Sequence, residues 1–274
     1  MRIRLVLLAL VTILCSGVYT APLAGSTLSA ASSSSEEPSS NTSDTPVSGS
    51  DVREEQLTLG ELRQKYADTF KTNGPSTKQV ALTFDDVPDP RFTPQVLDVL
   101  KKYKVRATFF VVGSRAEKHP DLVKRMVKEG HIVGNHSYNH PEFSKLSMTA
   151  FRKQILHTGD IIHRLTGYTP KMIRPPYGDI NEEQLRWAAK QHYSIVNWNV
   201  DSLDWKGLSK EKVKHNILSA VKPGSIVLQH AGGGTGSNLK GTVDALPEVI
   251  EELRNRGYEL VTLDEMLKLS KEKH

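Results

Sequence analysis

The stretch VALTFDD, residues 80–86, is a short apolar run that ends in two adjacent carboxylates. Such a run predicts a buried β-strand. Because side chains alternate along a strand, we expect Asp85 and Asp86 to point in different directions. One carboxylate would then bind a metal while the other acts as a base. On its own, such a pair is more often a polar turn, and residues 88–90 (Pro-Asp-Pro) also fit a turn. Its function therefore depends on partners elsewhere in the chain.

A repeating pattern of short apolar runs and amphipathic segments extends from this stretch to the end of the chain. The expected units are strand 80–84 with helix 94–103, strand 107–112 with helix 121–129, strand 131–134 with helix 149–165, strand 172–173 with helix 182–190, strand 194–198 with helix 210–220, strand 226–229 with helix 246–256, and strand 259–261 with helix 264–269.

Seven or eight strands that alternate with helices predict a parallel α/β fold. A doubly wound open sheet and a closed (β/α) barrel of the TIM type both fit this order. No glycine-rich nucleotide loop follows the first strand, where Asp85 and Asp86 stand instead. We therefore favour the barrel, in a single catalytic domain. The polar clusters of the chain all follow strands, and chemistry in such barrels gathers at the C-terminal ends of the strands.

The first 25 residues have the layout of an export signal. Arg2 and Arg4 precede an apolar run over 5–18, and small residues follow. The run is shorter than the roughly 20 residues that a membrane span needs, which favours cleavage over a retained N-terminal anchor. The sole cysteine, Cys15, lies within this segment, so the exported part has no disulfide.

The rest of the chain divides by composition. Residues 26–50 are rich in serine and too polar to fold, so we expect a flexible linker. Residues 51–75 read as a short leading helix or a continuation of the linker. The catalytic domain would cover 76–268, with a charged tail over 269–274. Without Arg2 and Arg4 the net charge falls from +5 to +3, with 34 basic and 31 acidic side chains. This mild balance argues against nucleic-acid binding.

Two histidines, His136 and His140, follow the third expected strand. Histidines four apart in a helical turn present both rings on one face, which is a common spacing for metal ligands. With a carboxylate such as Asp86 they would form a site of two histidines and one carboxylate. Three protein ligands on zinc leave one position open for water or substrate, as in catalytic sites. Taken alone, a pair of surface histidines is more often without function.

Three further clusters follow later strands. Arg174 begins the turn RPPYG and could hold a carboxylate ionised and oriented. His230 ends an apolar strand, and a neighbouring carboxylate would raise its pKa and make it a general acid. Asp204 is the candidate for that neighbour. Trp205 offers a flat apolar face for a sugar ring or an acetyl methyl group.

These five clusters, in their order along the chain, resemble the motifs of the polysaccharide deacetylases, carbohydrate esterase family four (the NodB homology domain). The matching segments are TFDD at 83–86, HSYNH at 136–140, RPPYG at 174–178, DSLDW at 201–205 and LQH at 228–230. The resemblance covers about residues 76–268. It implies a deformed (β/α) barrel that removes N- or O-acetyl groups from polysaccharides with one divalent metal, usually zinc, although cobalt or manganese can serve.

The resemblance also implies a role for each residue that matches. Asp85 is similar to the catalytic base, and Arg174 to the arginine that positions it. The metal ligands would be Asp86, His136 and His140, and the general acid would be His230 with Asp204 as its tuning partner. The remaining residues would contact substrate: Tyr177 through its backbone N–H on the oxyanion, Trp205 and Leu228 around the acetyl group, and Pro176 in the rigid turn.

Two positions depart from the pattern of the family. Val87 stands where the family usually has glycine, and a β-branched residue does not easily adopt a positive φ. His230 is followed by Ala231 and three glycines rather than by the usual aspartate. We expect this glycine-rich loop to be mobile and to shape the access of substrate.

The expected function is the removal of N-acetyl groups from a cell-wall polysaccharide, most simply the N-acetylglucosamine of peptidoglycan. Chitin oligomers and acetylxylan are alternative substrates, and a non-catalytic glycan-binding module on the same scaffold is the alternative of a different class. We expect a monomer that is secreted or held at the cell surface and that touches a membrane only through its N-terminal segment.

Overall fold

The structure, a computed structural model, describes residues 57–273. The expected signal segment 1–25 and linker 26–50 lie outside the described residues. No helix within the described part is both long enough and apolar enough to cross a membrane.

A single parallel sheet runs through the described residues. Its strands are β1 (Phe70–Lys71), β2 (Gln79–Val87), β3 (Thr108–Val111), β4 (Ile132–Asn135), β5 (Met172–Ile173), β6 (Ser194–Val196), β7 (Val200–Asp201), β8 (Ser225–His230) and β9 (Glu259–Leu260). Their spatial order is β1-β6-β5-β4-β3-β2-β8-β7, with β9 beside the start of β2. The long strand β2 therefore lies between β3 and β8.

The connection from β6 to β7 shows that this sheet must curl. In the strand order, β6 and β7 are six positions apart, which is about 29 Å in a flat sheet at roughly 4.8 Å per strand. Only residues 197–199 join them, and the four steps from Val196 to Val200 span at most about 14 Å. The two edges therefore approach each other, as in the deformed barrel expected from the sequence, and this prediction is confirmed.

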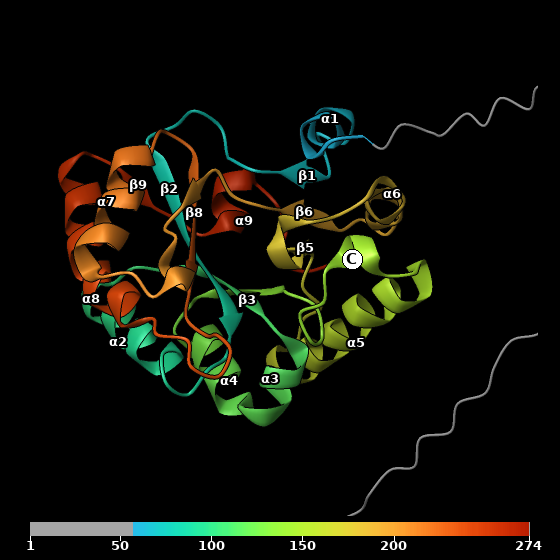
Figure 1. The fold of residues 1–274 in the computed structure, drawn as a ribbon, viewed down its shortest axis with the longest axis horizontal. Helices are drawn as coiled ribbons and strands as arrows, with labels where there is room; N and C mark the ends of the chain where they lie inside the picture. The colour runs from blue at the N-terminus through green and yellow to red at the C-terminus, as the bar shows by residue number, and fades with distance from the viewer. Residues whose placement is uncertain (1–56, 274) are drawn as a thin grey trace, which may run out of the picture. The chain divides into compact units, whose positions relative to one another are not determined.

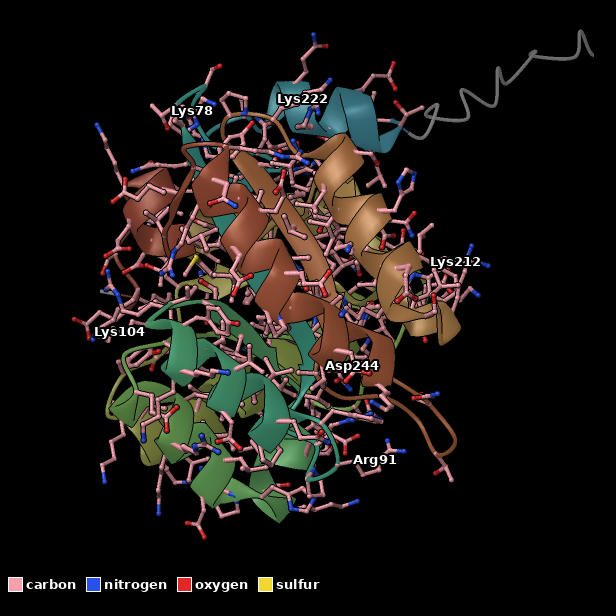
Figure 2. The ribbon with its side chains drawn as sticks, turned by 90° about the vertical axis from the view of Figure 1, so that its left-hand side faces the viewer. Lys78, Arg91, Lys104, Lys212, Lys222 and Asp244 are labelled. Carbon is pink, nitrogen blue, oxygen red and sulfur yellow. The ribbon has the colours of Figure 1, made fainter. Side chains whose placement is uncertain are left out.

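Helices cover the outside of the curled sheet. They are α1 (Leu59–Lys65), α2 (Thr93–Tyr103), α3 (Gly113–Lys118), α4 (Pro120–Lys128), α5 (Met148–Thr166), α6 (Glu182–Lys190), α7 (Lys210–Ala220), α8 (Lys240–Asn255) and α9 (Leu263–Leu267), with short 3-10 turns at 143–145, 176–178 and 204–206. Figure 1 shows α7, α8 and α2 on one side of the sheet and α5 and α6 on the other. Figure 2 looks onto the first of these sides, where α8 packs between α7 and α2.

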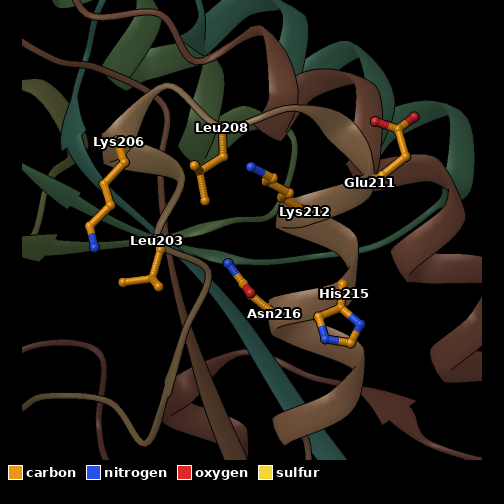
Figure 3. A pocket seen from close by; sticks show the side chains of 7 residues that line it. All are labelled: Leu203, Lys206, Leu208, Glu211, Lys212, His215 and Asn216. Atoms are coloured by element: carbon orange, nitrogen blue, oxygen red, sulfur yellow. The ribbon is translucent and has the colours of Figure 1, made fainter.

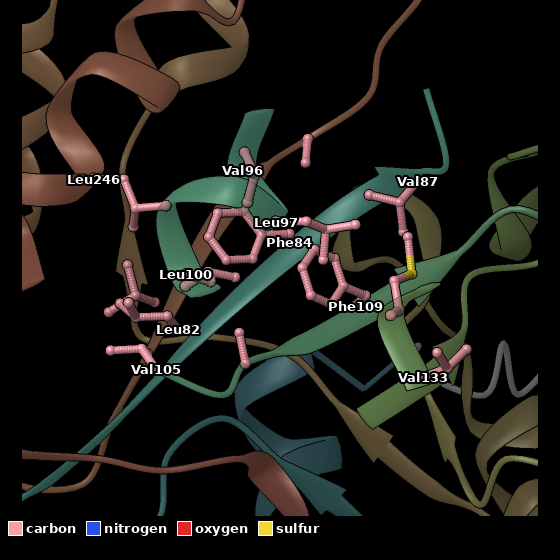
Figure 4. Packing of buried hydrophobic residues seen from close by; sticks show 14 of the residues in the cluster. Leu82, Phe84, Val87, Val96, Leu97, Leu100, Val105, Phe109, Val133 and Leu246 are labelled. Carbon is pink, nitrogen blue, oxygen red and sulfur yellow. The ribbon is translucent and has the colours of Figure 1, made fainter. Parts of the chain in front are cut away.

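Alternation along β2 separates two cores. Val80, Leu82 and Phe84 point outward and pack with the inner faces of the helices, and the Phe84 ring stacks on Phe109 at 5.2 Å between centroids (Figure 4). Ala81 points the other way and packs with residues such as Phe110 in the interior of the barrel. By the same alternation Thr83 and Asp85 face the interior, which places a carboxylate there.

The ends of the described chain are tied to the domain. Helix α1 begins with a capping box between Thr58 and Glu61, and Leu62 is buried against α6 and its neighbours. The Tyr66 hydroxyl donates to Glu182 at 2.8 Å. At the other end residues 271–273, expected as part of a charged tail, exchange backbone hydrogen bonds with residues 169–171.

Candidate active site

Asp85 is held in the interior by a buried arginine. Arg174 Nη1 donates to Asp85 Oδ1 at 2.8 Å and to Thr83 Oγ1 at 2.7 Å. Its Nε donates to the Val196 carbonyl, and its guanidinium lies over the Phe110 ring. Burial raises the pKa of Asp85, and the Arg174 charge opposes that rise. The arrangement leaves Asp85 Oδ2 without a hydrogen bond from any described residue and free to accept a proton.

Asp86 does not point away from Asp85, so the expectation of different directions is wrong. The β2–β3 register shifts between Phe84 and Val87, and Asp86 has a left-handed backbone with φ of 62°. This bulge turns the Asp86 side chain back toward the barrel opening. As a result His136 Nε2 lies 3.8 Å from both Asp85 Oδ2 and Asp86 Oδ1.

The two predicted histidine ligands come together, but not on a helix as expected. They lie in a loop after β4 in which Ser137 and His140 both have a positive φ. Ser137 Oγ accepts from the His140 backbone N–H, and Gln154 Oε1 of α5 accepts from the backbone N–H groups of Tyr138 and Asn139. These bonds, rather than a helical turn, bring the His136 and His140 rings together, with 4.9 Å between the ring centroids.

Asp86 of β2 and the two histidines of this loop form a donor set for a cation. The ligand atoms of Asp86, His136 and His140 lie within 4.8 Å of one another. Asp86 Oδ1 is 3.3 Å from His140 Nε2, and it is buried with no hydrogen-bond partner. Zinc ligands bound at about 2.0–2.2 Å in a tetrahedron are roughly 3.3–3.6 Å apart. The orphaned oxygen and the spacing therefore fit one divalent cation.

The protonation of His136 suits a metal ligand. Burial, together with neighbouring His140, lowers the pKa of His136 to about 3. Its ring is therefore neutral near pH 7. The ring Nδ1 lies 2.7 Å from the Arg174 carbonyl and donates its hydrogen there. This contact leaves the lone pair of Nε2 facing Asp86, as a metal ligand requires.

Tyr177 lies at the tip of a strained turn beside His140. It has φ of 59° and ψ of 8°, a conformation that costs free energy for a residue other than glycine. Its side chain is 69% exposed, and its ring meets His140 edge-on at 4.7 Å. Within the described chain no acceptor takes the Tyr177 backbone N–H. Pro176, expected to contact substrate, is buried beneath this turn and is absent from the lining of the cavity.

The candidate general acid is positioned by a buried carboxylate. Asp204 Oδ1 is 2.7 Å from His230 Nδ1, and Asp204 Oδ2 accepts from the His230 backbone N–H and from the Thr242 hydroxyl. Burial disfavours the charged ring, but the charge and hydrogen bond of Asp204, with the charges of Asp85 and Asp86, raise the pKa of His230 to about 9. His230 is therefore protonated near pH 7. In register it lies beside Asp85 on the neighbouring strand.

Replacing Asp204 should shift the alkaline limit of activity. A protonated His230 is needed to donate, so activity of the wild type should fall as the pH rises through about 9. In Asp204→Asn the negative charge that raises the pKa of His230 is lost, while the burial that lowers this pKa remains. The alkaline limb of the pH profile should therefore move to lower pH by about 1 unit or more. The profile of kcat/KM against pH, at equal metal loading for both proteins, measures this. An unmoved limb would show that another group sets it.

A cavity of about 700 Å³ joins these groups at the C-terminal end of the strands. Of the predicted residues, Asp85, Asp86, His136, His140, Tyr177, Trp205, Leu228 and His230 line it. Trp205 is 55% exposed, whereas Leu228 is buried. Arg174 and Asp204 lie fully buried behind the wall and act through the side chains they hold.

Comparison with known proteins agrees with this geometry. The polysaccharide deacetylase family matches residues 72–196. A peptidoglycan-N-acetylglucosamine deacetylase of Bacillus cereus is 50% identical over 211 residues, which are 77% of this chain and 75% of that protein. The chain belongs to the polysaccharide deacetylase family.

A solved structure and a second curated relative add detail on this polysaccharide deacetylase. The crystal structure of the Bc1960 peptidoglycan N-acetylglucosamine deacetylase, in complex with 4-naphthalen-1-yl-N-oxidanyl-benzamide, has a TM-score of 0.76 and 47% identity, and covers 79% of this chain and all of that chain. A peptidoglycan-N-acetylmuramic acid deacetylase of Bacillus subtilis, PdaC, is 42% identical over 203 residues, 74% of this chain and 42% of that protein. This chain thus spans about two fifths of PdaC.

The two positions that depart from the family pattern fit the fold. Asp86 takes the left-handed conformation, whereas Val87 remains in β2 and is fully buried in the outer core (Figure 4). The conflict expected at Val87 therefore does not arise. In the loop after His230, a Cβ on Gly232 would lie 1.9 Å from the Asp86 carbonyl oxygen. Glycine is needed there because the loop backbone rests on the bulge that carries Asp86, the predicted metal ligand.

The glycine-rich loop is also tied to the loop after β2. Arg91 Nη2 donates to the carbonyls of Gly233 and Gly234 at 3.1 Å, and the Gly233 N–H donates to Asp89 Oδ2. Figure 2 shows Arg91 next to the loop that precedes α8. These bonds join two segments that are about 140 residues apart in sequence and that follow the neighbouring parallel strands β2 and β8.

A second hollow, of about 390 Å³, lies behind the segment that carries Asp204 and Trp205. In Figure 3 side chains of the 203–208 loop and of α7 face one another across it. Asn216 of α7 donates to the Ser202 carbonyl at 2.9 Å, which fixes the segment from this side. The hollow therefore belongs to the support of the acid rather than to the catalytic cavity.

Several residues of the site carried no role in the sequence analysis. Trp198, Asn139, Arg115 and Leu239 line the cavity, and Thr83, Gln154 and Thr242 hold catalytic or ligand groups by hydrogen bonds. Trp198 follows an expected strand, and the position of such residues after strands was the one available signal. The hydroxyls and the amide come from distant elements and have no local pattern.

Proposed function

We propose that this polysaccharide deacetylase removes N-acetyl groups from N-acetylglucosamine residues of peptidoglycan, with zinc as its metal. The observation that carries the proposal is the arginine-held Asp85 beside the donor set of Asp86, His136 and His140, with protonated His230 on the next strand. A base, a cation site and an acid around one cavity are what hydrolysis of an amide requires. The peptidoglycan substrates named for the two Bacillus relatives support the choice of glycan.

The residues divide the reaction between them. Asp85 Oδ2 accepts a proton from the water that attacks the acetyl carbon, while Arg174 keeps Oδ1 in place. The Tyr177 N–H, which has no partner in the described chain, donates to the oxygen that becomes negative. His230 gives its proton to the sugar nitrogen as the carbon–nitrogen bond breaks. Acetate and a free amine result.

A divalent cation held by Asp86, His136 and His140 would supply Lewis acidity to the acetyl carbonyl and the attacking water. Two imidazoles and one carboxylate suit zinc, and cobalt or manganese can occupy such a donor set. The neutral state of His136 and the orphaned Asp86 Oδ1 favour metal binding at neutral pH.

Acetate release from a panel of glycans tests this function. The metal-loaded protein should release acetate from peptidoglycan fragments, and removal of the metal by a chelator should abolish the release until zinc is added back. Far-ultraviolet circular dichroism should show that the fold survives chelation. Release from chitin oligomers but never from peptidoglycan fragments would contradict the proposed substrate, and undiminished release without metal would contradict the mechanism.

Chitin oligomers and acetylxylan are the alternative substrates, and the glycan panel separates them. A non-catalytic glycan-binding module would be expected to lack the base or the acid. In this chain Asp85 and His230 are both present, and each is held by a buried charged partner. This completeness favours catalysis.

We also propose that the protein acts as a monomer outside the cell, either secreted or held at the cell surface. The support is the export-like sequence of residues 1–25 and the serine-rich segment that follows it. An acetamido glycan of the cell wall would be within reach of an enzyme in that position.

A further inference from the structure

The catalytic cavity continues into a neighbouring hollow. This hollow, of about 640 Å³, shares Arg115, Asn139, His140, Gly233 and Gly234 with the catalytic cavity. Because the metal ligand His140 lines both spaces, a glycan whose acetamido group lies at the metal site can extend an adjacent sugar into the hollow. We call this space the side hollow.

The side hollow is unbalanced in charge. Three positively charged side chains line it, those of Arg91, Arg115 and Lys118, against a single carboxylate, that of Asp89. Each oxygen of Asp89 already accepts two hydrogen bonds, three of them from Arg91 and the fourth from Gly233. Asp89 and Arg91 therefore neutralise each other, and Arg115 and Lys118 remain.

Arg115 makes little use of its guanidinium inside the protein. Its nearest carboxylate oxygen, Asp89 Oδ2, is 3.7 Å away, and no hydrogen bond from the guanidinium reaches another described residue. The side chain is 27% exposed and lies against Gly232, at the wall shared by the catalytic cavity and the side hollow. The proposed chemistry gives it no role. An arginine with free donors at such a place is suited to a carboxylate of the substrate.

We propose that Arg115, with the field of Lys118, binds a carboxylate carried by the sugar next to the one that is deacetylated. The inference rests on the proposed function. In peptidoglycan the neighbour of N-acetylglucosamine is muramic acid, whose lactyl ether or attached peptide carries carboxylates. Chitin oligomers have no such group. The side hollow would therefore make the enzyme prefer acidic glycans over neutral ones.

The test is the ratio of kcat/KM on an acidic glycan to that on chitohexaose. Arg115→Gln should lower this ratio about tenfold, the effect of losing one charge-assisted hydrogen bond. Lys222→Gln removes one positive charge from an exposed site in the loop between α7 and β8, and it should leave the ratio as it is. Figure 2 shows Lys222 at the opposite end of the domain from Arg91. Arg115→Lys should retain part of the preference.

Two acidic glycans identify the carboxylate. Peptide-free glycan strands carry the lactyl carboxylate, whereas muropeptides carry only those of the peptide. The wild type should lose about tenfold in kcat/KM on amidated strands if the lactyl carboxylate is bound, and on amidated muropeptides if a peptide carboxylate is bound. That measurement decides the question even if Arg115→Gln does not fold.

An unchanged ratio in Arg115→Gln, or equal rates on the free and amidated forms of both the strands and the muropeptides, would overturn the inference while acetate release still supports the deacetylase. An equal loss on acidic and neutral glycans would assign Arg115 a structural role and would also overturn it. Absence of acetate release from every glycan by the metal-loaded wild type would instead remove the proposed function, and the inference with it.

Discussion

Asp85→Asn should lower acetate release by about 10²–10⁴-fold while the protein still binds its cation. A positioned general base contributes about that much, and an amide cannot take the proton. The cation should stay because its donor set is Asp86, His136 and His140, and Asp85 Oδ1 is occupied by Arg174. Steady-state acetate release and zinc titration calorimetry measure the two properties on the same preparation.

Asp86→Asn is the matched control because it changes the neighbouring carboxylate. Asp86 Oδ1 is the orphaned oxygen of the donor set, 3.3 Å from His140 Nε2. Its loss should weaken zinc binding by more than roughly 10–100-fold, which is the cost of removing a residue that only hydrogen-bonds a metal ligand. The two variants together separate the base from the ligand. Near-normal turnover in Asp85→Asn would show that another group accepts the proton.

The sequence predicted the strand–helix order because apolar residues recur with the spacing of a strand or a helix over most units. The strands β1 and β7 have two residues each and were missed, whereas the equally short β5 and β9 were predicted because each opens a strand–helix unit. Strand β1 is followed directly by β2, and β7 follows β6 directly, so the alternation does not mark them. The helix α3 was missed because it has only six residues and begins with glycine. Helix α8 begins at Lys240 rather than near Leu246, and it contains Pro247. Burial along one face of α8 outweighs the backbone hydrogen bond that proline cannot make.

The structure places the predicted site residues, except Pro176, in one cavity or directly behind its wall, but two of the geometries expected for them were wrong. Alternation predicted opposite directions for the Asp85 and Asp86 side chains. The bulge, in which Asp86 has a left-handed backbone, turns the Asp86 side chain to the same side as Asp85. A helical turn was expected between His136 and His140, and a loop held by Gln154 brings them together instead. Bulges and loops depend on contacts with distant elements, so a local pattern can identify the residues without giving their conformation.

The buried contacts of Arg174 were also only partly predictable from the local sequence. Arg174 was expected to pair with a carboxylate, and the structure places it on Asp85. Its contacts with Thr83 and the Val196 carbonyl follow from the curl of the sheet, which brings β5, β2 and β6 around one guanidinium. Nothing in the sequence near Arg174 indicates that closure.

Arg174→Met should reduce stability more than any other single change at the site. The guanidinium is fully buried, and removing one partner of a buried ion pair costs about 3–5 kcal/mol because the other charge is left uncompensated. For a domain of this size that is a fall in Tm of about 6–20 °C. Without Arg174 the pKa of Asp85, already raised by burial, should rise further, so a smaller share of the base is ionised at a given pH and activity falls.

A double-mutant cycle separates the ion pair from packing. In the double variant Asp85→Asn/Arg174→Met neither charge remains. Its free energy of unfolding should therefore fall by less than the sum of the losses in the two single variants. Urea unfolding at pH 7, with and without zinc, gives the four free energies. The acid limb of residual activity in Arg174→Met should also move to higher pH, since a carboxylate with a raised pKa ionises later. Additive free energies together with an unmoved acid limb would mean that Arg174 acts through its size and its bond to the Val196 carbonyl. The charge would then have no part in holding Asp85 ready.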